Sequence, residues 1–183
     1  DNVCLETSLI DKIEGNQIIT KDGICHEVDA IIFGTGFEAN IFISPVKIVG
    51  SNEIKLDDVW SNGAEAYRGV MVPNFPNFYI CYGPNTNTGH VSIIYMIESQ
   101  IMFIMKCLKY LKNNKLNYLD VKNTAMKSYN NKLQKKLSDT VWASNCGSWY
   151  KTKEGKIINN YPGYGTEYYF MMSRPNYNEL NAE

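Results

Sequence analysis

The sequence has few arginines and no excess of positive charge. Its 183 residues include 18 Lys or Arg and 19 Asp or Glu, and the only arginines are Arg68 and Arg174. A surface that attracts nucleic acid or an anionic membrane needs a positive field, and Arg is the side chain best suited to phosphate. Lysines gather between residues 106 and 136 without aromatic platforms between them, which favours the solvated face of a helix. We therefore expect no nucleic-acid partner.

The sequence also lacks paired cysteines and clustered histidines. Its five cysteines are widely spaced, and none belongs to a C-x-x-C pair. They are typical of reduced thiols in an intracellular protein, so we predict a cytoplasmic location. His26 and His90 are the only histidines and have no carboxylate cluster beside them, which predicts that the chain holds no metal. No G-x-S-x-G motif occurs and Cys146 has no adjacent base, so covalent catalysis is not expected.

No long apolar run is free of polar or charged residues. The most apolar segment, residues 91–111, carries Glu98, Gln100 and Lys106, which a bilayer would penalise. We predict a largely buried helix here and no transmembrane segment, because apolar residues recur at three- and four-residue spacing. The predicted apolar stripe comprises Ile93, Ile97, Ile101, Ile104, Leu108 and Leu111.

The composition is that of a folded protein, but the start of the chain is unusual. A hydrophobic content of 44% and a charged content of 20% are globular values. The first residue is Asp and not Met, and no signal peptide is visible, because a basic start and a long apolar run are both missing. We interpret the chain as a piece of a longer polypeptide, with part of the machinery expected upstream.

Several short β-prone runs point to an α/β fold. Residues 9–13 and 17–20 flank "EGN", a hairpin signal, and "KDG" supplies a second turn. The uninterrupted apolar run 30–33 predicts a strand buried on both faces, as in parallel sheets. Further strands are predicted at 46–49 and 78–82. The aromatic, turn-rich tail from residue 141 onward is interpreted as strands and loops.

A pair of glycines follows the predicted strand 30–33 in "FGTGF". Gly34 and Gly36 have no Cβ, so a cofactor or another chain segment can approach the backbone closely. In open α/β folds, ligands bind at this edge of the sheet. The motif lacks the third glycine of a phosphate-binding loop, and a tight turn after a core strand explains it equally well.

The stretch "YGPNTNTGHVSIIYMIESQ" places a polar turn directly before the apolar helix. If the helix begins within "NTGHVS", its first backbone N–H groups are unpaired and carry partial positive charge, which suits an anion or a carbonyl oxygen. An ordinary N-cap by Asn87 or Thr88 is the alternative. His90 could act as a base, but a structural or cofactor-contacting role is favoured.

Three stretches together resemble the C-terminal third of flavin-containing monooxygenases of the Baeyer–Villiger type. They are "DAIIFGTGF", "PNFPNFYICYGPNTNTGHVSIIYMIESQ" and "CGSWYKTKEGKIINNYPG", and the likeness runs from about Val3 to Pro175. The first matches D-x-I-I-x-A-T-G-F/Y, with Gly34 where Ala is usual. The second matches G-P-N-x-x-x-G-H-x-S, with Glu98 and Gln100 at their customary places.

The resemblance implies the C-terminal part of an α/β flavoprotein with two Rossmann-like dinucleotide-binding domains, one for FAD and one for NADPH. Residues 1–40 would be the end of the NADPH-binding domain and the crossover strand. Residues 41–183 would be the C-terminal part of the FAD-binding domain with segments of the substrate pocket.

The family's turn after G-P-N lies against the pyrimidine end of the flavin ring. The positions that the resemblance carries over as cofactor-binding are Asn85, Thr88, Gly89, His90 and Ile93, and Gly36 is added as a cofactor-binding candidate because its missing Cβ allows close approach. No catalytic residue is carried over, since neither arginine lies in a matching context.

The implied reaction inserts one oxygen atom from O2 into a ketone, or onto a soft heteroatom, through a C4a-peroxyflavin. The chain on its own is expected to be inactive. Two alternatives stay open: a simple N- or S-oxygenating monooxygenase, and a non-catalytic module that keeps the flavoprotein fold and binds a partner. Neither the substrate nor the oligomeric state is predicted.

Overall fold

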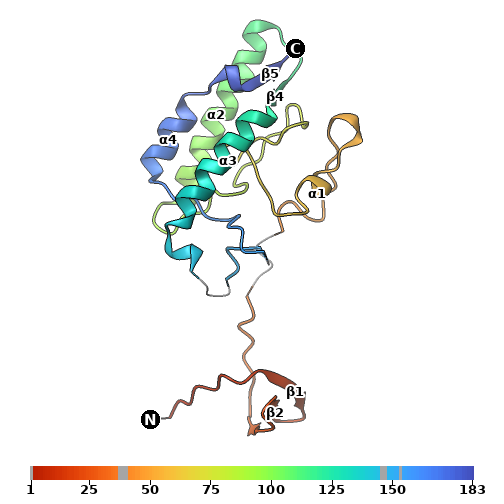
Figure 1. Cartoon of the computed structure of the whole chain (residues 1–183), viewed down its shortest axis with the longest axis vertical. Coiled ribbons are helices and arrows are strands. Elements are labelled where there is room, and N and C mark those ends of the chain that lie inside the picture. Colours follow the sequence, from red (N-terminus) through yellow and green to blue (C-terminus); the bar gives the residue numbers. More distant parts are fainter. Residues whose placement is uncertain (1, 37–40, 145–147, 153) are drawn as a thin grey trace. The chain divides into compact units, whose positions relative to one another are not determined.

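The structure is a computed structural model that describes residues 2–36, 41–144, 148–152 and 154–183 (Figure 1). The chain divides into two compact units, Asp1–Phe37 and Glu38–Glu183. The assignment of these units to an NADPH-binding and an FAD-binding domain stays a prediction. Five strands are described: β1 Ile10–Glu14, β2 Gln17–Thr20, β3 Cys25–Glu27, β4 Leu119–Val121 and β5 Leu180–Ala182. The helices are η1 Ser51–Glu53, α1 Leu56–Val59, α2 Ile93–Asn114, α3 Asn123–Ser138, η2 Val141–Ala143, α4 Gly165–Ser173 and η3 Tyr177–Glu179.

The first unit is a three-stranded antiparallel sheet in the order β1-β2-β3. Glu14 pairs with Gln17 across a two-residue turn, in which Gly15 has a φ of 61°. A second turn, closed by the N–H of Gly23 to the carbonyl of Thr20, leads into β3. The sequence predicted both turns and the two strands beside the first, because short hairpins depend on local residues with positive φ.

Residues 30–33 do not form the predicted buried strand. They have no regular secondary structure, and Ile32 and Phe33 are 95% and 73% exposed. A strand of a parallel sheet needs a hydrogen-bonded neighbour on at least one side. No strand in the described part of the chain pairs with this run, so the prediction is wrong for the chain as it stands.

The second unit is built around three helices. Helix α4 packs along α2, and the ring of Tyr95 stacks on Tyr169 with centroids 6.1 Å apart. The starts of the two helices lie side by side, since a Cβ on Gly165 would lie 3.3 Å from Cε1 of Tyr95. Farther along, Lys106 of α2 donates to the carbonyl of Ser173 at the end of α4. The two helices therefore run in the same direction (Figure 1). Strands β4 and β5 pair antiparallel and join the segment after α2 to the C-terminus.

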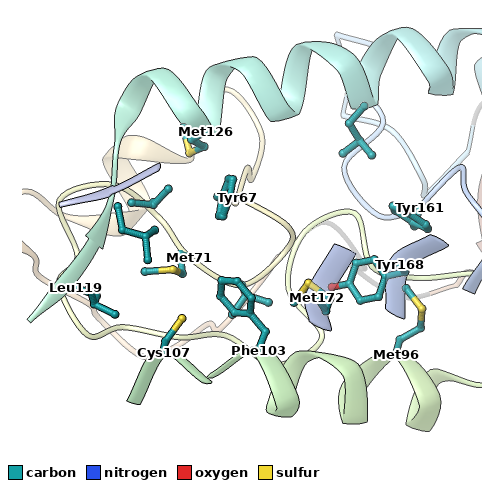
Figure 2. Packing of buried hydrophobic residues seen from close by; sticks show 14 of the residues in the cluster. Tyr67, Met71, Met96, Phe103, Cys107, Leu119, Met126, Tyr161, Tyr168 and Met172 are labelled. Atoms are coloured by element: carbon teal, nitrogen blue, oxygen red, sulfur yellow. The ribbon is translucent and has the colours of Figure 1, made fainter. Parts of the chain in front are cut away.

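The main core lies between these helices. Figure 2 shows Phe103 and Cys107 of α2, Met126 of α3, and Tyr168 and Met172 of α4 within this core. The buried face of α2 differs from the predicted apolar stripe, since Ile101 and Leu108 are exposed while polar Gln100 is fully buried. The isoleucine pattern indicated the helix but not its orientation. The buried residues of α2 are Met96, Ser99, Gln100, Phe103, Cys107 and Leu111.

Helix α3 confirms the interpretation of the lysine-rich segment as a solvated helical face. Its buried residues, Met126, Asn130, Leu133 and Leu137, recur at three- and four-residue spacing. The lysines of this helix occupy the remaining, exposed positions. This is the burial pattern of an amphipathic helix on a core.

The segment between residues 41 and 92 is mostly irregular. The strands predicted at 46–49 and 78–82 are wrong: Val49 makes one isolated bridge to Lys55, and residues 78–82 have no strand pairing. Both runs nevertheless contribute to a second small core. It contains Leu56, Ala66, Val72, Phe75 and Ile80. From the two apolar runs, Ile80 is buried in this core and Ile48 packs against it, although neither run forms a strand.

The tail contains a helix that the sequence did not predict. Helix α4 spans Gly165–Ser173 in a stretch rich in Tyr and Phe, which favour strands. Tyr168 and Met172, four residues apart, are both fully buried against α2. Packing of this pair outweighs the local preference for extended backbone.

Candidate functional site

The turn before α2 is held by the segment at residues 157–160. The side-chain amide of Asn85 donates to the carbonyls of Ile157, at 2.9 Å, and Asn160, at 3.0 Å. The backbone N–H of Asn85 donates to the carbonyl of Ile158 at 2.8 Å. Asn85 is only 2% exposed and has a φ of 55°. Because both of its amide hydrogens are used inside the protein, the structure assigns Asn85 to shaping the turn.

Helix α2 begins later than predicted. Its first residue is Ile93 and its N-cap is Ser92, so the stretch "NTGHVS" precedes the helix. Thr88 does not cap the helix; its hydroxyl donates to the carbonyl of Val91 at 2.8 Å and closes a local turn. The side chain of Ser92 makes no capping hydrogen bond. The first N–H groups of α2 are therefore not covered by a side-chain cap.

A hollow of about 550 Å³ lies at this end of α2. This volume is in the range of small-molecule binding sites. His90, one of the predicted residues, lines it, and Gly89 is exposed beside it. The ring of His90 stands edge-on to the ring of Tyr164, with 6.4 Å between centroids. The lining residues are His90, Val91, Ser92, Tyr95, Tyr164, Gly165 and Thr166.

Two helix N-termini meet at this hollow. Gly165, the first residue of α4, allows the close approach, because a Cβ there would lie 2.9 Å from Cγ1 of Val91. Tyr164, the N-cap of α4, makes no side-chain capping bond. Since α2 and α4 run in the same direction, the positive ends of both helix dipoles point toward one place. This arrangement favours a ligand with negative charge or with carbonyl oxygens.

The charges near the hollow agree with such a ligand. None of the lining residues is acidic, and the first turn of α2 contains no acidic residue. The one acidic residue in the first turn of α4, Glu167, is paired with Lys136, whose Nζ lies 2.6 Å from its Oε1. A Cβ on Gly89 would have no neighbour closer than Cζ2 of Trp142 at 4.0 Å. Packing within the described chain therefore leaves the space over Gly89 open.

The structure brings most of the predicted site residues together, but not all. Asn85, Thr88, Gly89, His90 and Ile93 lie on one continuous stretch at the start of α2. Gly36 belongs to the first unit, where it is exposed with a φ of 80°. A Cβ on Gly36 would have nothing within 4 Å. The cofactor role of Gly36 stays a prediction.

Sequence reasoning missed the second wall of the hollow. Tyr164, Gly165 and Thr166 come from the tail, far from the G-P-N motif in the sequence. The available signal was "YPGYGTE", in which Pro and Gly precede a helical segment. It was interpreted as part of a loop because the following aromatic residues concealed the helix.

Two further searches concern metals and membranes. Among the described residues, no group of three or more His, Cys, Asp or Glu is placed to hold a metal ion. None of the helices in the described ranges is long and apolar enough to span a bilayer.

Comparison with known proteins places the chain among the relatives of flavin-dependent monooxygenases. No family model matches the chain. A Baeyer–Villiger monooxygenase of Pseudomonas aeruginosa is 42% identical over 165 residues, which cover 89% of this chain and 31% of the relative. An uncharacterized monooxygenase of Mycobacterium tuberculosis is 37% identical over 155 residues, covering 85% of this chain and 31% of the relative.

The fold agrees with these relatives. The crystal structure of OTEMO in complex with FAD and NADP matches with a TM-score of 0.78 and 23% identity, covering 96% of this chain and 33% of that one. The resemblance to the C-terminal portion of Baeyer–Villiger monooxygenases, predicted from the motifs, is thus confirmed. The predicted fold class is confirmed as well, since the chain has the mixed helix and strand fold of about a third of the OTEMO chain. The chain spans about a third of the length of the relatives it matches.

Proposed function

We propose that this chain is the C-terminal portion of an FAD- and NADPH-dependent monooxygenase, and that the hollow at the starts of α2 and α4 receives the ring system of the flavin. The observation that carries the proposal is the meeting of two uncapped helix N-termini beside exposed Gly89 and His90. The relationship to Baeyer–Villiger monooxygenases, and the FAD and NADP in the OTEMO structure, support it.

The residues present fit a flavin. The isoalloxazine ring is planar and aromatic, with carbonyl oxygens at one end that become electron-rich on reduction. His90, Tyr95 and Tyr164 offer ring faces and edges in the hollow. The N–H groups at the starts of α2 and α4 can donate hydrogen bonds to the carbonyl oxygens of the ring. The dipoles of the two helices favour the reduced, negative form of the flavin. We infer that Thr88 and Asn85 act indirectly, by shaping the turn that leads into the site.

Bound flavin would supply the activation of O2 that places one oxygen atom into a ketone or onto a soft heteroatom. The protein's part is to orient the ring, to stabilise charge at its carbonyl end and to keep water away. Because the chain spans about a third of its relatives, the remaining substrate and NADPH contacts are proposed to come from other parts of the full polypeptide. The chain by itself is proposed to be inactive.

A chimera tests the proposal. In the Pseudomonas aeruginosa relative, the segment that aligns with this chain would be replaced by the chain. The expected product is a yellow protein whose flavin absorbance bleaches with NADPH under anaerobic conditions. A comparison of the turnover rates with a cyclic ketone and with an organic sulfide then distinguishes Baeyer–Villiger oxygenation from heteroatom oxygenation. If the chimera is folded by circular dichroism but takes up no FAD, while the parent does, the proposal is wrong.

Substitution of Ser92 tests the location of the flavin. Ser92→Asp places a carboxylate at the uncapped start of α2, which should raise stability by about 0.5–1 kcal/mol through capping and the helix dipole. The same carboxylate would occupy the N–H groups and repel the carbonyl end of the ring, so FAD should bind about tenfold more weakly, or about 1.4 kcal/mol. Ser92→Asn is the matched control, because it caps without charge and should weaken binding less. Unchanged FAD affinity in Ser92→Asp would place the flavin elsewhere.

A further inference from the structure

A chain of hydrogen bonds runs through the core from the turn before α2 to the carbonyl of Arg68. The backbone N–H of Tyr82 donates to Oε1 of Gln100 at 2.8 Å. Nε2 of Gln100 donates to the hydroxyl of Tyr168 at 2.9 Å. The Tyr168 hydroxyl donates to the backbone carbonyl of Arg68 at 2.8 Å. Gln100 and Tyr168 are both fully buried.

The direction of this chain is determined by its two ends. A backbone N–H can only donate, so the Gln100 amide must turn its oxygen toward Tyr82 and its NH2 toward Tyr168. The Tyr168 hydroxyl then accepts from Gln100 and has its single hydrogen left for the Arg68 carbonyl. Burial raises the pKa of Tyr168, which keeps this hydrogen in place. The hydrogen bonds therefore all run in one direction, from the N–H of Tyr82 to the carbonyl of Arg68.

The far end of the chain is anchored by the Arg68 side chain. Its Nη1 donates to the carbonyl of Met171 at 2.6 Å and to that of Arg174 at 3.2 Å, at the end of α4. Its Nη2 lies 3.7 Å from Oε2 of Glu179. Arg68 is 8% exposed, whereas the side chain of Glu179 is 37% exposed. One arginine thus binds the end of α4 with its side chain and the middle of α4, at Tyr168, with its carbonyl.

The near end of the chain is a strained turn. Tyr82 has a φ of 57°, which is rare for a bulky residue and persists only where surrounding contacts enforce it. The hydrogen bond from its N–H to Gln100 is one such contact. A second is the packing of Gly83 against Gly69, where a Cβ on Gly83 would lie 2.4 Å from the Gly69 carbonyl oxygen. Contacts with Gln100 of α2 and with Gly69 therefore help to hold the turn in this shape.

We propose that Gln100 and Tyr168 are positioning residues for the cofactor site. Neither lines the hollow at the start of α2. Through the Tyr82 N–H they hold the turn whose continuation presents Thr88, Gly89 and His90. Substitutions that remove the buried polar atoms of Gln100 or Tyr168 should consequently change the affinity for the cofactor, although neither residue contacts it. This inference rests on the proposed function, because it requires that the hollow receives the flavin.

The test uses the chimera with three substitutions. Gln100→Met removes both hydrogen bonds of the amide at similar size, and Tyr168→Phe removes one hydroxyl. Tyr161→Phe is the matched control: Tyr161 is 4% exposed and its ring lies edge-on to Tyr168 at 5.0 Å, but its hydroxyl takes no part in the chain. Three quantities are measured: amide hydrogen exchange at Tyr82, the dissociation constant for FAD, and the urea midpoint.

Gln100→Met should speed exchange at Tyr82 about tenfold and weaken FAD binding about fivefold, because the N–H of Tyr82 loses its buried acceptor. Tyr168→Phe should change both in the same direction by a smaller factor. Tyr161→Phe should leave both unchanged even if it lowers the urea midpoint, which separates positioning from general stability. If Gln100→Met fails to fold, Tyr168→Phe carries the test.

The outcomes separate the two proposals. Unchanged exchange at Tyr82, or faster exchange with unchanged FAD affinity, in a flavin-containing chimera overturns the positioning role alone. A folded chimera that takes up no FAD overturns the proposed function and the positioning role with it. Equal loss of FAD affinity in Tyr161→Phe also overturns the positioning role, because the effect would then follow packing and not the hydrogen-bond chain.

Discussion

Gly69 and Gly83 pack backbone against backbone, and neither position has room for a side chain. A Cβ on Gly83 would lie 2.4 Å from the carbonyl oxygen of Gly69, and a Cβ on Gly69 would lie 2.1 Å from Cγ2 of Thr86. This contact joins the loop that carries Arg68 to the turn before α2. The two loops that shape the candidate site are therefore held together at glycines.

Gly83→Ala should destabilise the chain by about 1–3 kcal/mol, the usual cost of overpacking a close contact. Its φ lies outside the left-handed region, so the cost reports the clash with the Gly69 carbonyl and not backbone strain. Urea denaturation measures it. Gly34→Ala is the control, because a Cβ there would have no neighbour within 4 Å and should be neutral. Equal effects of the two substitutions would contradict the contact.

Lys115→Gly should stabilise the chain by about 1 kcal/mol, since glycine adopts left-handed backbone without the steric cost of a Cβ. Lys115 is the exposed C-cap of α2 and has a φ of 54°. Lys112→Gly, inside the last turn of the same helix, should destabilise by about 1 kcal/mol. Thermal and urea unfolding of both variants check the opposite signs. A loss of stability in both would show that Lys115 does not hold this conformation.

Cys107 should resist alkylation in the folded chain, whereas Cys4, Cys25 and Cys81 should react. Cys107 is fully buried, and burial raises the pKa of its thiol to about 12. At pH 8 on the order of one thiol in ten thousand is then ionised, and the thiolate is the reactive form. A short pulse of iodoacetamide followed by peptide mass spectrometry distinguishes the sites, and Cys107 should react only after unfolding in urea. Rapid labelling of Cys107 without urea would be inconsistent with the core in Figure 2.

Asp120→Asn should become progressively favourable as the pH rises from 3 to 7. Burial raises the pKa of Asp120 above its ordinary value of 3.8, although its Oδ2 accepts from the N–H of Asn74 at 2.9 Å. A raised carboxyl pKa means that the folded state favours the protonated form, so its contribution is present below pH 3.8 and is lost as the pH rises through the folded pKa. Asparagine keeps an acceptor for Asn74 and does not ionise.

Urea midpoints of Asp120→Asn and the unmodified chain at several pH values test this sign. Asp139→Asn, at the exposed C-cap of α3, controls for the change in net charge. A difference that is constant with pH, or that shrinks as the pH rises, would contradict the prediction.

Local sequence signals predicted the elements that depend on neighbours in the chain. The hairpin at Gly15 and Asn16 follows from residues that tolerate positive φ. Helix α3 agrees with the interpretation of the lysine-rich segment as the solvated face of a helix. The G-P-N and G-H motifs likewise located Asn85, Thr88, Gly89 and His90, four of the five predicted site residues that lie together at the start of α2.

The predictions failed where an element depends on partners distant in the sequence. Residues 30–33 and 78–82 have the composition of buried strands, but a strand exists only where another strand pairs with it. Helix α4 was missed because its formation depends on Tyr168 and Met172 packing against α2. The buried face of α2 was predicted wrongly because a polar residue was not expected inside the core. The free-energy cost of burying the Gln100 amide is offset by its hydrogen bonds with Tyr82 and Tyr168.

The candidate site likewise has one part that the sequence predicted and one part that only tertiary packing forms. The residue pattern after Tyr82 identified the family resemblance and one wall of the hollow, because the residues of that wall are close together in the sequence. Tyr164 and Gly165 complete the hollow from the tail, and no local pattern pairs them with His90. Only the parallel packing of α4 on α2, allowed by the missing side chain of Gly165, brings the two helix N-termini to one place.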